Sequence, residues 1–179
     1  MKYARIERER RFLLPVLPDA LDPDRGFRRI TDTYIPNTRL RLRHVQSEDG
    51  TTLQWKLTQK YQTADSPETH TILTNMYLDD AEAMTLRRIP GAVLQKRRYV
   101  LNHEGLMFAV DVFEGALCGL IIAECEFPND AEAAQTSTPP FAAVEITSDP
   151  FFRGGRLAFA SPEDVHAELR RRLNRETRD

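Results

Sequence analysis

Charged side chains recur at every second position along several short segments, and this spacing determines which chemistry they could share. In a β-strand, residues i, i+2 and i+4 point to one face of the sheet. Paired carboxylates would lie on one face of two segments: Glu7 with Glu9, and Glu124 with Glu126. Three other segments would present faces made of cations: Arg39, Arg41 and Arg43; Lys56 and Lys60; Lys96 and Arg98. Asp111 lies on the strand predicted between the last cationic segment and the second acidic one.

Like charges that lie close together on a sheet repel each other unless ions of opposite sign compensate them. A bound polyanion would compensate the cationic faces, because arginine offers bidentate forks and lysine a point charge to phosphate oxygens. A divalent metal would compensate the carboxylates, whose oxygens favour Mg²⁺ or Mn²⁺ over zinc. Metal and cations together stabilise phosphoryl transfer. The alternatives are a solvated outer face for each strand taken singly, and a structural barrel with incidental charge alternation.

Alternation with a period of two residues dominates the first two thirds of the chain and predicts strands. The predicted strands cover residues 3–14, 29–35, 39–45, 51–61, 69–78, 93–102, 106–113, 120–127 and 144–147. The turn signals Pro36-Asn37 and Asp49-Gly50 separate neighbouring strands. A closed barrel would give the charged faces one shared interior and would leave no exposed sheet edge.

Helix signals are fewer and lie between or after the strands. Asp79 or Asp80 opens a short helix over residues 81–88, and Asn129 opens a second one. Ser161, followed by a proline and two acids, opens a longer helix predicted at about 161–176. Residues 15–26 are expected to form a loop or a short helical turn, and residues 63–68 a loop.

Length and composition limit the class of protein. A chain of 179 residues, 41% hydrophobic and 29% charged, suits one folded domain, predicted to span residues 1–179. The net charge of −2 produces no global field that would attract nucleic acid or a membrane. Two cysteines make no disulfide framework, and the charged N-terminus argues against a signal peptide. We expect a soluble cytoplasmic protein, whose last helix could either cover one mouth of the barrel or mediate a homodimer.

The order of the charged segments resembles the CYTH family, whose members are also called triphosphate tunnel metalloenzymes. The resemblance runs from Ile6 to about Ala158. The segments that carry it are Glu7-Arg8-Glu9-Arg10-Arg11-Phe12 (an ExExK-type motif), Arg39-Leu40-Arg41-Leu42-Arg43, Lys56-Leu57-Thr58-Gln59-Lys60, Lys96-Arg97-Arg98-Tyr99, Val110-Asp111-Val112-Phe113-Glu114-Gly115, Ala123-Glu124-Cys125-Glu126-Phe127 and Val144-Glu145-Ile146-Thr147-Ser148-Asp149 (similar to EVTxD).

The resemblance implies an α+β fold, namely an eight-stranded antiparallel β-barrel, or tunnel, with helices packed outside. It implies candidate metal ligands at Glu7, Glu9, Asp111, Glu124 and Glu126. It implies candidate phosphate ligands at Arg11, Arg41, Arg43, Lys56, Lys60, Lys96, Arg98 and Arg153, with Arg11 and Lys96 as the candidate catalytic residues. Known activities in the family include inorganic triphosphatase, thiamine triphosphatase and a class of adenylate cyclase.

Two departures from the family pattern bear on activity. Arg11 stands where the first motif usually ends in lysine, and arginine cannot act as a base at neutral pH. Residues 69–75 stand where an RxExE-type motif is usual, and they contain no carboxylate. The leading hypothesis is a metal-dependent hydrolase of inorganic triphosphate or a related linear triphosphate. The alternatives are a polyphosphate- or nucleotide-binding protein without turnover, and an adenylate cyclase.

Overall fold

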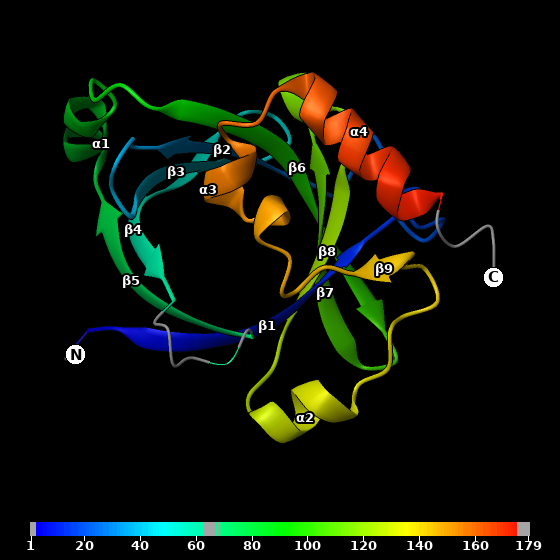
Figure 1. Ribbon diagram of the computed structural model, residues 1–179. Helices are drawn as coiled ribbons and strands as arrows, with labels where there is room; N and C mark the ends of the chain where they lie inside the picture. The colour runs from blue at the N-terminus through cyan, green and yellow to red at the C-terminus, as the bar shows by residue number, and fades with distance from the viewer. Residues whose placement is uncertain (1–2, 63–66, 68, 175–179) are drawn as a thin grey trace.

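A closed ring of antiparallel strands dominates the computed structural model, which describes residues 3–62, 67 and 69–174 (Figure 1). Eight strands form the ring in the order β1-β5-β4-β3-β2-β6-β7-β8, and β8 pairs with β1 again. Their bounds are β1 Arg5–Leu13, β2 Arg28–Tyr34, β3 Leu40–Gln46, β4 Thr52–Tyr61, β5 His70–Leu78, β6 Ala92–His103, β7 Leu106–Phe113 and β8 Ile121–Glu126. The α+β tunnel fold that the sequence predicts is therefore confirmed.

Strand β1 closes the ring because its two halves have different partners. Residues Arg5 to Arg8 pair with β5, and residues Glu9 to Leu13 pair with β8. A short strand β9, Val144–Glu145, pairs with the end of β1. It covers only half of the strand predicted at residues 144–147, because Ile146 and Thr147 turn into the segment that follows.

Local signals explain the hairpins and helices. Asn37 and Gly50 adopt positive φ angles of 57° and 88°, as their predicted turns require. A capping box between Asp79 and Glu82 opens α1, Asp80–Leu86. Helix α2 spans Asp130–Gln135, and α4 spans Pro162–Leu173. Of the loop predicted at 63–68, residues 63–66 and 68 lie outside the described part of the chain.

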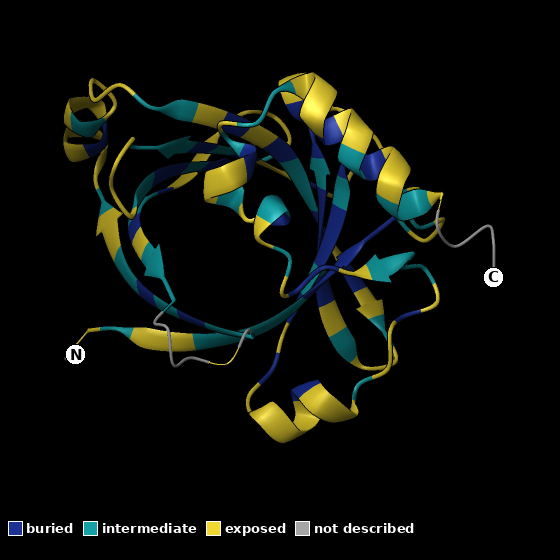
Figure 2. Ribbon diagram, viewed as in Figure 1, coloured by how far each residue is buried: buried dark blue, intermediate teal, exposed yellow. Residues whose placement is uncertain are grey.

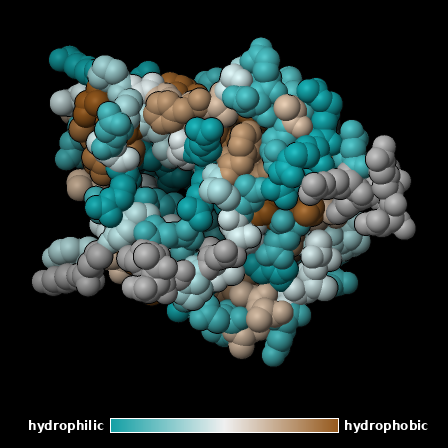
Figure 3. Space-filling model, viewed as in Figure 1, coloured by the Kyte–Doolittle hydropathy of each residue, from teal (hydrophilic) through white to brown (hydrophobic). Residues whose placement is uncertain are grey.

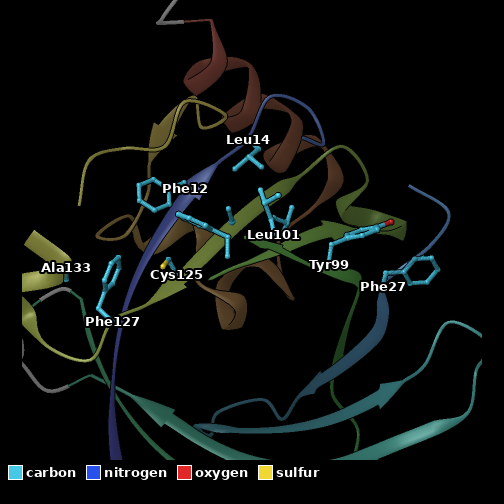
Figure 4. Close-up of a cluster of buried hydrophobic side chains, with 11 residues drawn as sticks. Phe12, Leu14, Phe27, Tyr99, Leu101, Cys125, Phe127 and Ala133 are labelled. Atoms are coloured by element: carbon cyan, nitrogen blue, oxygen red, sulfur yellow. The ribbon is translucent and has the colours of Figure 1, made fainter. Parts of the chain in front are cut away.

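Most of the apolar core lies outside the ring, between the strands and the segments that cover them. Figure 2 shows the most continuous burial where β7, β8 and the end of β1 lie together. Outward-facing side chains of these strands and β1, among them Phe12, Tyr99 and Phe108, form one cluster under the loops and α2 (Figure 4). On the other side of the ring, Ala83 of α1 packs against Leu42 and Trp55. The interior of the ring holds most of the paired charged side chains, together with an apolar cluster at one end.

One end of the ring is partly closed by a segment that the sequence analysis did not predict to be helical. This segment contains a 3₁₀ turn, η2 (Pro150–Phe152), and one helical turn, α3 (Gly154–Leu157), which lies within the outline of the ring in Figure 1. Phe152 and Leu157 pack with inward-facing apolar residues of the strands in a second core cluster. Glycine at position 154 lets the helical turn pack closely against Tyr34, because a Cβ there would collide with the Tyr34 hydroxyl unless that side chain moved.

Among the described residues, no helix has the length and apolar character needed to cross a membrane.

Candidate functional site

The ring encloses a cavity of about 1030 Å³ that brings most of the predicted site residues together. Hydrophilic residues border the hollow on the face shown in Figure 3. The predicted residues that line the cavity are Glu7, Glu9, Arg11, Arg41, Arg43, Lys56, Lys60, Lys96, Arg98, Glu124, Glu126 and Arg153. Asp111 lies behind the cavity wall, and its side chain is only 1% exposed.

The acidic wall consists of Glu7 and Glu9 on β1 and Glu124 and Glu126 on β8. Glu9 lies directly opposite Glu126 in the strand register, which is a repulsive arrangement for two carboxylates. The Lys60 ammonium compensates part of this charge: Nζ lies 3.0 Å from Glu9 Oε1 and 3.4 Å from Glu7 Oε2. Although burial raises the pKa of Glu7, Lys60 and Arg5 hold it below its usual value.

The acidic wall has the chemistry of a site for a hard divalent cation. All of its donors are carboxylate oxygens, which Mg²⁺ and Mn²⁺ prefer. In the described part of the chain no three acidic, histidine or cysteine side chains already converge as a metal site. Instead, the Lys60 ammonium stands in for a cation between Glu7 and Glu9. The residues therefore fit a metal in donor type, provided that their side chains rearrange.

The first part of the basic wall is Arg41 and Arg43 on β3, which are held by Asp32 of β2. Arg43 donates to both Asp32 oxygens, from Nε at 2.6 Å and from Nη2 at 2.7 Å, and Arg41 Nε lies 3.6 Å away. Although burial raises the pKa of Asp32, the two arginines lower it well below its usual value. Charge-assisted bidentate pairs of this kind fix a guanidinium in one orientation.

Sequence reasoning missed Asp32, although a signal was available. The turn Pro36-Asn37 sets the register of the β2–β3 hairpin, and that register places Asp32 directly opposite Arg43. A carboxylate opposite a cationic strand face is the pattern that would have identified it.

The second part of the basic wall repeats this arrangement with Lys96 and Arg98 on β6 and Asp111 on β7. Arg98 Nε and Nη2 each lie 2.6 Å from an Asp111 oxygen, and the Lys96 ammonium contacts the same carboxylate. Arg98 Nη2 also reaches Glu124 at 2.7 Å. The structure thus pairs Asp111 with the cations of β6, and Arg98 links it to Glu124 of the acidic wall. Its grouping with the four glutamates as a metal ligand stays a prediction.

Lys56 differs from the other lysines of the cavity, because no carboxylate among the described residues forms an ion pair with it. Burial, with the positive charges of Arg43 and Arg41, lowers its pKa to about 8. An ammonium in this position favours an anion that would enter the cavity.

Arg11 fastens the C-terminal segment to β1. Its guanidinium donates to the carbonyl of Phe152 at 3.0 Å and to that of Thr147 at 3.1 Å, and its backbone N–H donates to Thr147 Oγ1 at 3.0 Å. Arg153 follows Phe152 at the edge of the cavity. Arg11 thereby anchors the backbone that directly precedes Arg153.

Strand β5 contributes neutral side chains to the cavity, as the missing RxExE-type motif predicts. Thr71, Leu73 and Asn75 point inward. Thr58 of β4 donates to Asn75 Oδ1 at 2.8 Å. In the described part of β5 no carboxylate faces the cavity.

Comparison with known proteins gives distant matches. No protein-family model matches the chain. An inorganic triphosphatase of Acetivibrio thermocellus is 38% identical over 65 residues, which are 36% of this chain and 40% of the relative. An inorganic triphosphatase of Nitrosomonas europaea is 33% identical over 73 residues, 40% of this chain and 48% of the relative. The matched part thus spans less than half the length of each curated relative.

Two crystal structures match nearly end to end. The hypothetical protein NE1496 is 25% identical, with a TM-score of 0.59, over 87% of this chain and 99% of that one. The inorganic triphosphatase NE1496 is 24% identical, with a TM-score of 0.59, over 87% and 96%. An antiparallel barrel with carboxylates on one inner wall and cations on the others defines a triphosphate tunnel fold. The chain shares the fold of these structures and carries the order of charged strands that is typical of the CYTH family, and its distant homologues are inorganic triphosphatases.

Proposed function

We propose that this protein is a metal-dependent hydrolase of inorganic triphosphate or of a related linear triphosphate. The observation that carries the proposal is the division of one cavity into a wall of four glutamates and a wall of cations oriented by two buried aspartates. The distant inorganic triphosphatases support it. Positioning and charge account for most of the catalysis of phosphoryl transfer, and this cavity offers both.

The basic wall would bind the substrate. Arg41, Arg43 and Lys56 on one side, and Lys96 and Arg98 on the other, would donate to phosphate oxygens along the chain of phosphates. Arg153 would add a contact at the end that the C-terminal segment partly closes. Lys96 would stabilise the negative charge that develops at the reacting phosphate. Arg11 would help to hold that phosphate in place, and it would not act as a base.

The acidic wall would hold the divalent metal. Glu7, Glu9, Glu124 and Glu126 are the proposed ligands, with Mg²⁺ or Mn²⁺ as the ion. A metal bound there supplies charge neutralisation for phosphate oxygens and lowers the pKa of a coordinated water. Asp111 has a different task in this proposal, because its carboxylate orients Lys96 and Arg98.

Phosphate release from tripolyphosphate, measured with Mg²⁺ and with Mn²⁺, tests the proposal. The double variant Glu124→Gln/Glu126→Gln should lose at least about a hundredfold in rate, since it removes half of the acidic wall. The matched control is Asp19→Asn/Asp24→Asn, which makes the same charge change in the loop outside the ring and should hydrolyse like wild type. Equal rates for wild type and the glutamate double variant would overturn the metal assignment.

A second candidate function is a polyphosphate-binding protein without turnover. The neutral inner face of β5 favours it, because this strand adds no carboxylate to the acidic wall. Calorimetry that shows tripolyphosphate binding, together with no phosphate release with either metal, would support it. Any hydrolysis of tripolyphosphate would rule out this second candidate. An assay for a cyclic nucleotide product from ATP distinguishes an adenylate cyclase from a hydrolase.

A further inference from the structure

Lys60 and Lys56 share one strand face but have opposite surroundings. The Lys60 ammonium is bound between Glu7 and Glu9, whereas Lys56 forms no ion pair with a described carboxylate. Both lysines line the same cavity. One lysine is therefore engaged by the acidic wall, and the other is available to an anion.

The ammonium of Lys60 uses oxygen atoms that the proposed metal ligands would need. It contacts Glu9 Oε1 and Glu7 Oε2, one oxygen of each β1 carboxylate. An ammonium and a divalent cation at the same oxygens would repel each other at close range. Lys60 must therefore leave these carboxylates when a metal ion takes them.

Arg98 also contacts the acidic wall, but its situation differs. It is bound to Glu124 and, through a bidentate pair, to Asp111. Release from Glu124 would leave Arg98 with its second carboxylate. No second carboxylate outside the acidic wall pairs with Lys60 in the described part of the chain, so its release creates a free cation inside the cavity.

We propose that Lys60 couples metal binding to triphosphate binding, a proposal that rests on the function proposed above. Without ligands, Lys60 compensates part of the charge of Glu7 and Glu9. With a metal on these carboxylates, the released ammonium becomes a phosphate ligand beside Lys56. Each ligand then favours the other, and the coupling is reciprocal because it is a property of the equilibrium.

Calorimetric titration with Mg²⁺ alone tests the first half of the proposal. Lys60→Met removes the competing ammonium, and its Mg²⁺ affinity should exceed that of wild type by about fivefold or more, the usual lower bound of coupling between sites. Lys56→Met is the matched control, with the same change on the same strand face, and its Mg²⁺ affinity should stay near the wild-type value. Equal or weaker Mg²⁺ binding by Lys60→Met would overturn the proposal.

An imido-bridged triphosphate, which resists hydrolysis, tests the coupling itself. After correction for Mg²⁺ bound by the free analogue, Mg²⁺ should raise the analogue's affinity for wild type by about fivefold more than for Lys60→Met. Lys60→Arg keeps the competing cation and should retain the wild-type ratio. An equal Mg²⁺ effect in wild type and Lys60→Met would contradict the coupling.

A measurement on the wild-type chain covers the case in which Lys60→Met fails to fold. The ¹⁵Nζ resonance of Lys60, assigned by its loss in Lys60→Arg, should shift on Mg²⁺ addition, and that of Lys56 should shift less. An unmoved Lys60 resonance with Mg²⁺ bound would overturn the proposal. In that case, tripolyphosphate hydrolysis by wild type would still support the proposed function. Conversely, coupling between Mg²⁺ and analogue binding without any hydrolysis would support the role of Lys60 and exclude the hydrolase.

Discussion

The two walls of the cavity are stabilised in different ways. On the basic wall, Asp32 and Asp111 lie buried behind the cations and hold them with bidentate hydrogen bonds from neighbouring strands. On the acidic wall, Glu7 and Glu9 share a lysine from β4, a strand that does not pair with β1, and Glu7 also pairs with Arg5 of its own strand. The basic wall is thus organised before any ligand arrives, whereas the acidic wall has to exchange partners to bind a metal.

The largest expected effect comes from breaking the support of the basic wall. Asp32→Asn leaves Arg43 and Arg41 without their buried carboxylate, and removal of one partner from a buried ion pair costs about 3–5 kcal/mol. Urea unfolding measures this loss, and tripolyphosphate affinity should fall with it because both arginines lose their orientation. Asp19→Asn, in the outer loop, is the control and should change neither quantity.

The sign of the pH dependence at Asp32 follows from its lowered pKa. The stability that Asp32 contributes is fully present above the pKa of the unfolded chain and is lost as the pH falls through the folded value. Asp32→Asn should therefore show a smaller loss of stability than wild type between neutral and acidic pH. Parallel curves for the two proteins would show that the carboxylate does not support this wall.

An effect of intermediate size concerns Lys56, whose pKa is lowered to about 8. Tripolyphosphate binding should weaken as the pH rises above this value, by up to about tenfold per pH unit, because binding then requires uptake of a proton. Lys56→Arg keeps its charge over this range and should remove that step. Calorimetry at a series of pH values measures the tripolyphosphate affinity of both proteins. Identical pH dependence in wild type and Lys56→Arg would contradict a lowered pKa at Lys56.

The free energy of unfolding should rise with pH because of Lys56, whereas tripolyphosphate affinity falls. The lowered pKa means that the charged form disfavours the folded state, and this cost disappears as the pH rises from about 8 towards the usual 10.5. Wild type should therefore gain stability relative to Lys56→Arg across this window.

The smallest expected effect comes from adding a carboxylate to the acidic wall. Thr71 of β5 lies opposite Glu7 in the register, so Thr71→Glu places a third carboxylate beside Glu7 and Glu9. Mg²⁺ affinity should rise severalfold, and stability should fall by about 0.2–1 kcal/mol because like charges now lie opposite each other. Thr74→Glu, on the outward face of the same strand, is the control. If both variants bind Mg²⁺ equally, position 71 does not belong to the metal side of the cavity.

The alternation of residues predicted the strands and their inner faces because side-chain direction in a strand is a local property. Glu7 with Glu9, and Lys56 with Lys60, could be assigned to the interior from their spacing, and the structure places all four on the cavity wall. The identity of the neighbouring strand is not local. That β4 supplies the lysine for β1 depends on how the ring closes.

How deeply a side chain is buried in the cavity wall could not be predicted from the local sequence either. Asp111 lies opposite Arg98 in the register, as its spacing predicts, but it is buried in its ion pairs with Arg98 and Lys96. The helical turn α3 escaped prediction because glycine opens it and its stability comes from packing of Leu157 in the core. Its sequence has little helical preference of its own.

The pairing of β1 with β8 has a consequence for the integrity of the site. Glu9 and Glu126 face each other although more than a hundred residues separate them along the chain. Joining such distant segments costs more loop-closure entropy than forming a hairpin. The acidic wall is built from both β1 and β8, so neither the N-terminal nor the C-terminal half of the polypeptide contains all four glutamates. The glutamates come together only in a chain that has folded as a whole.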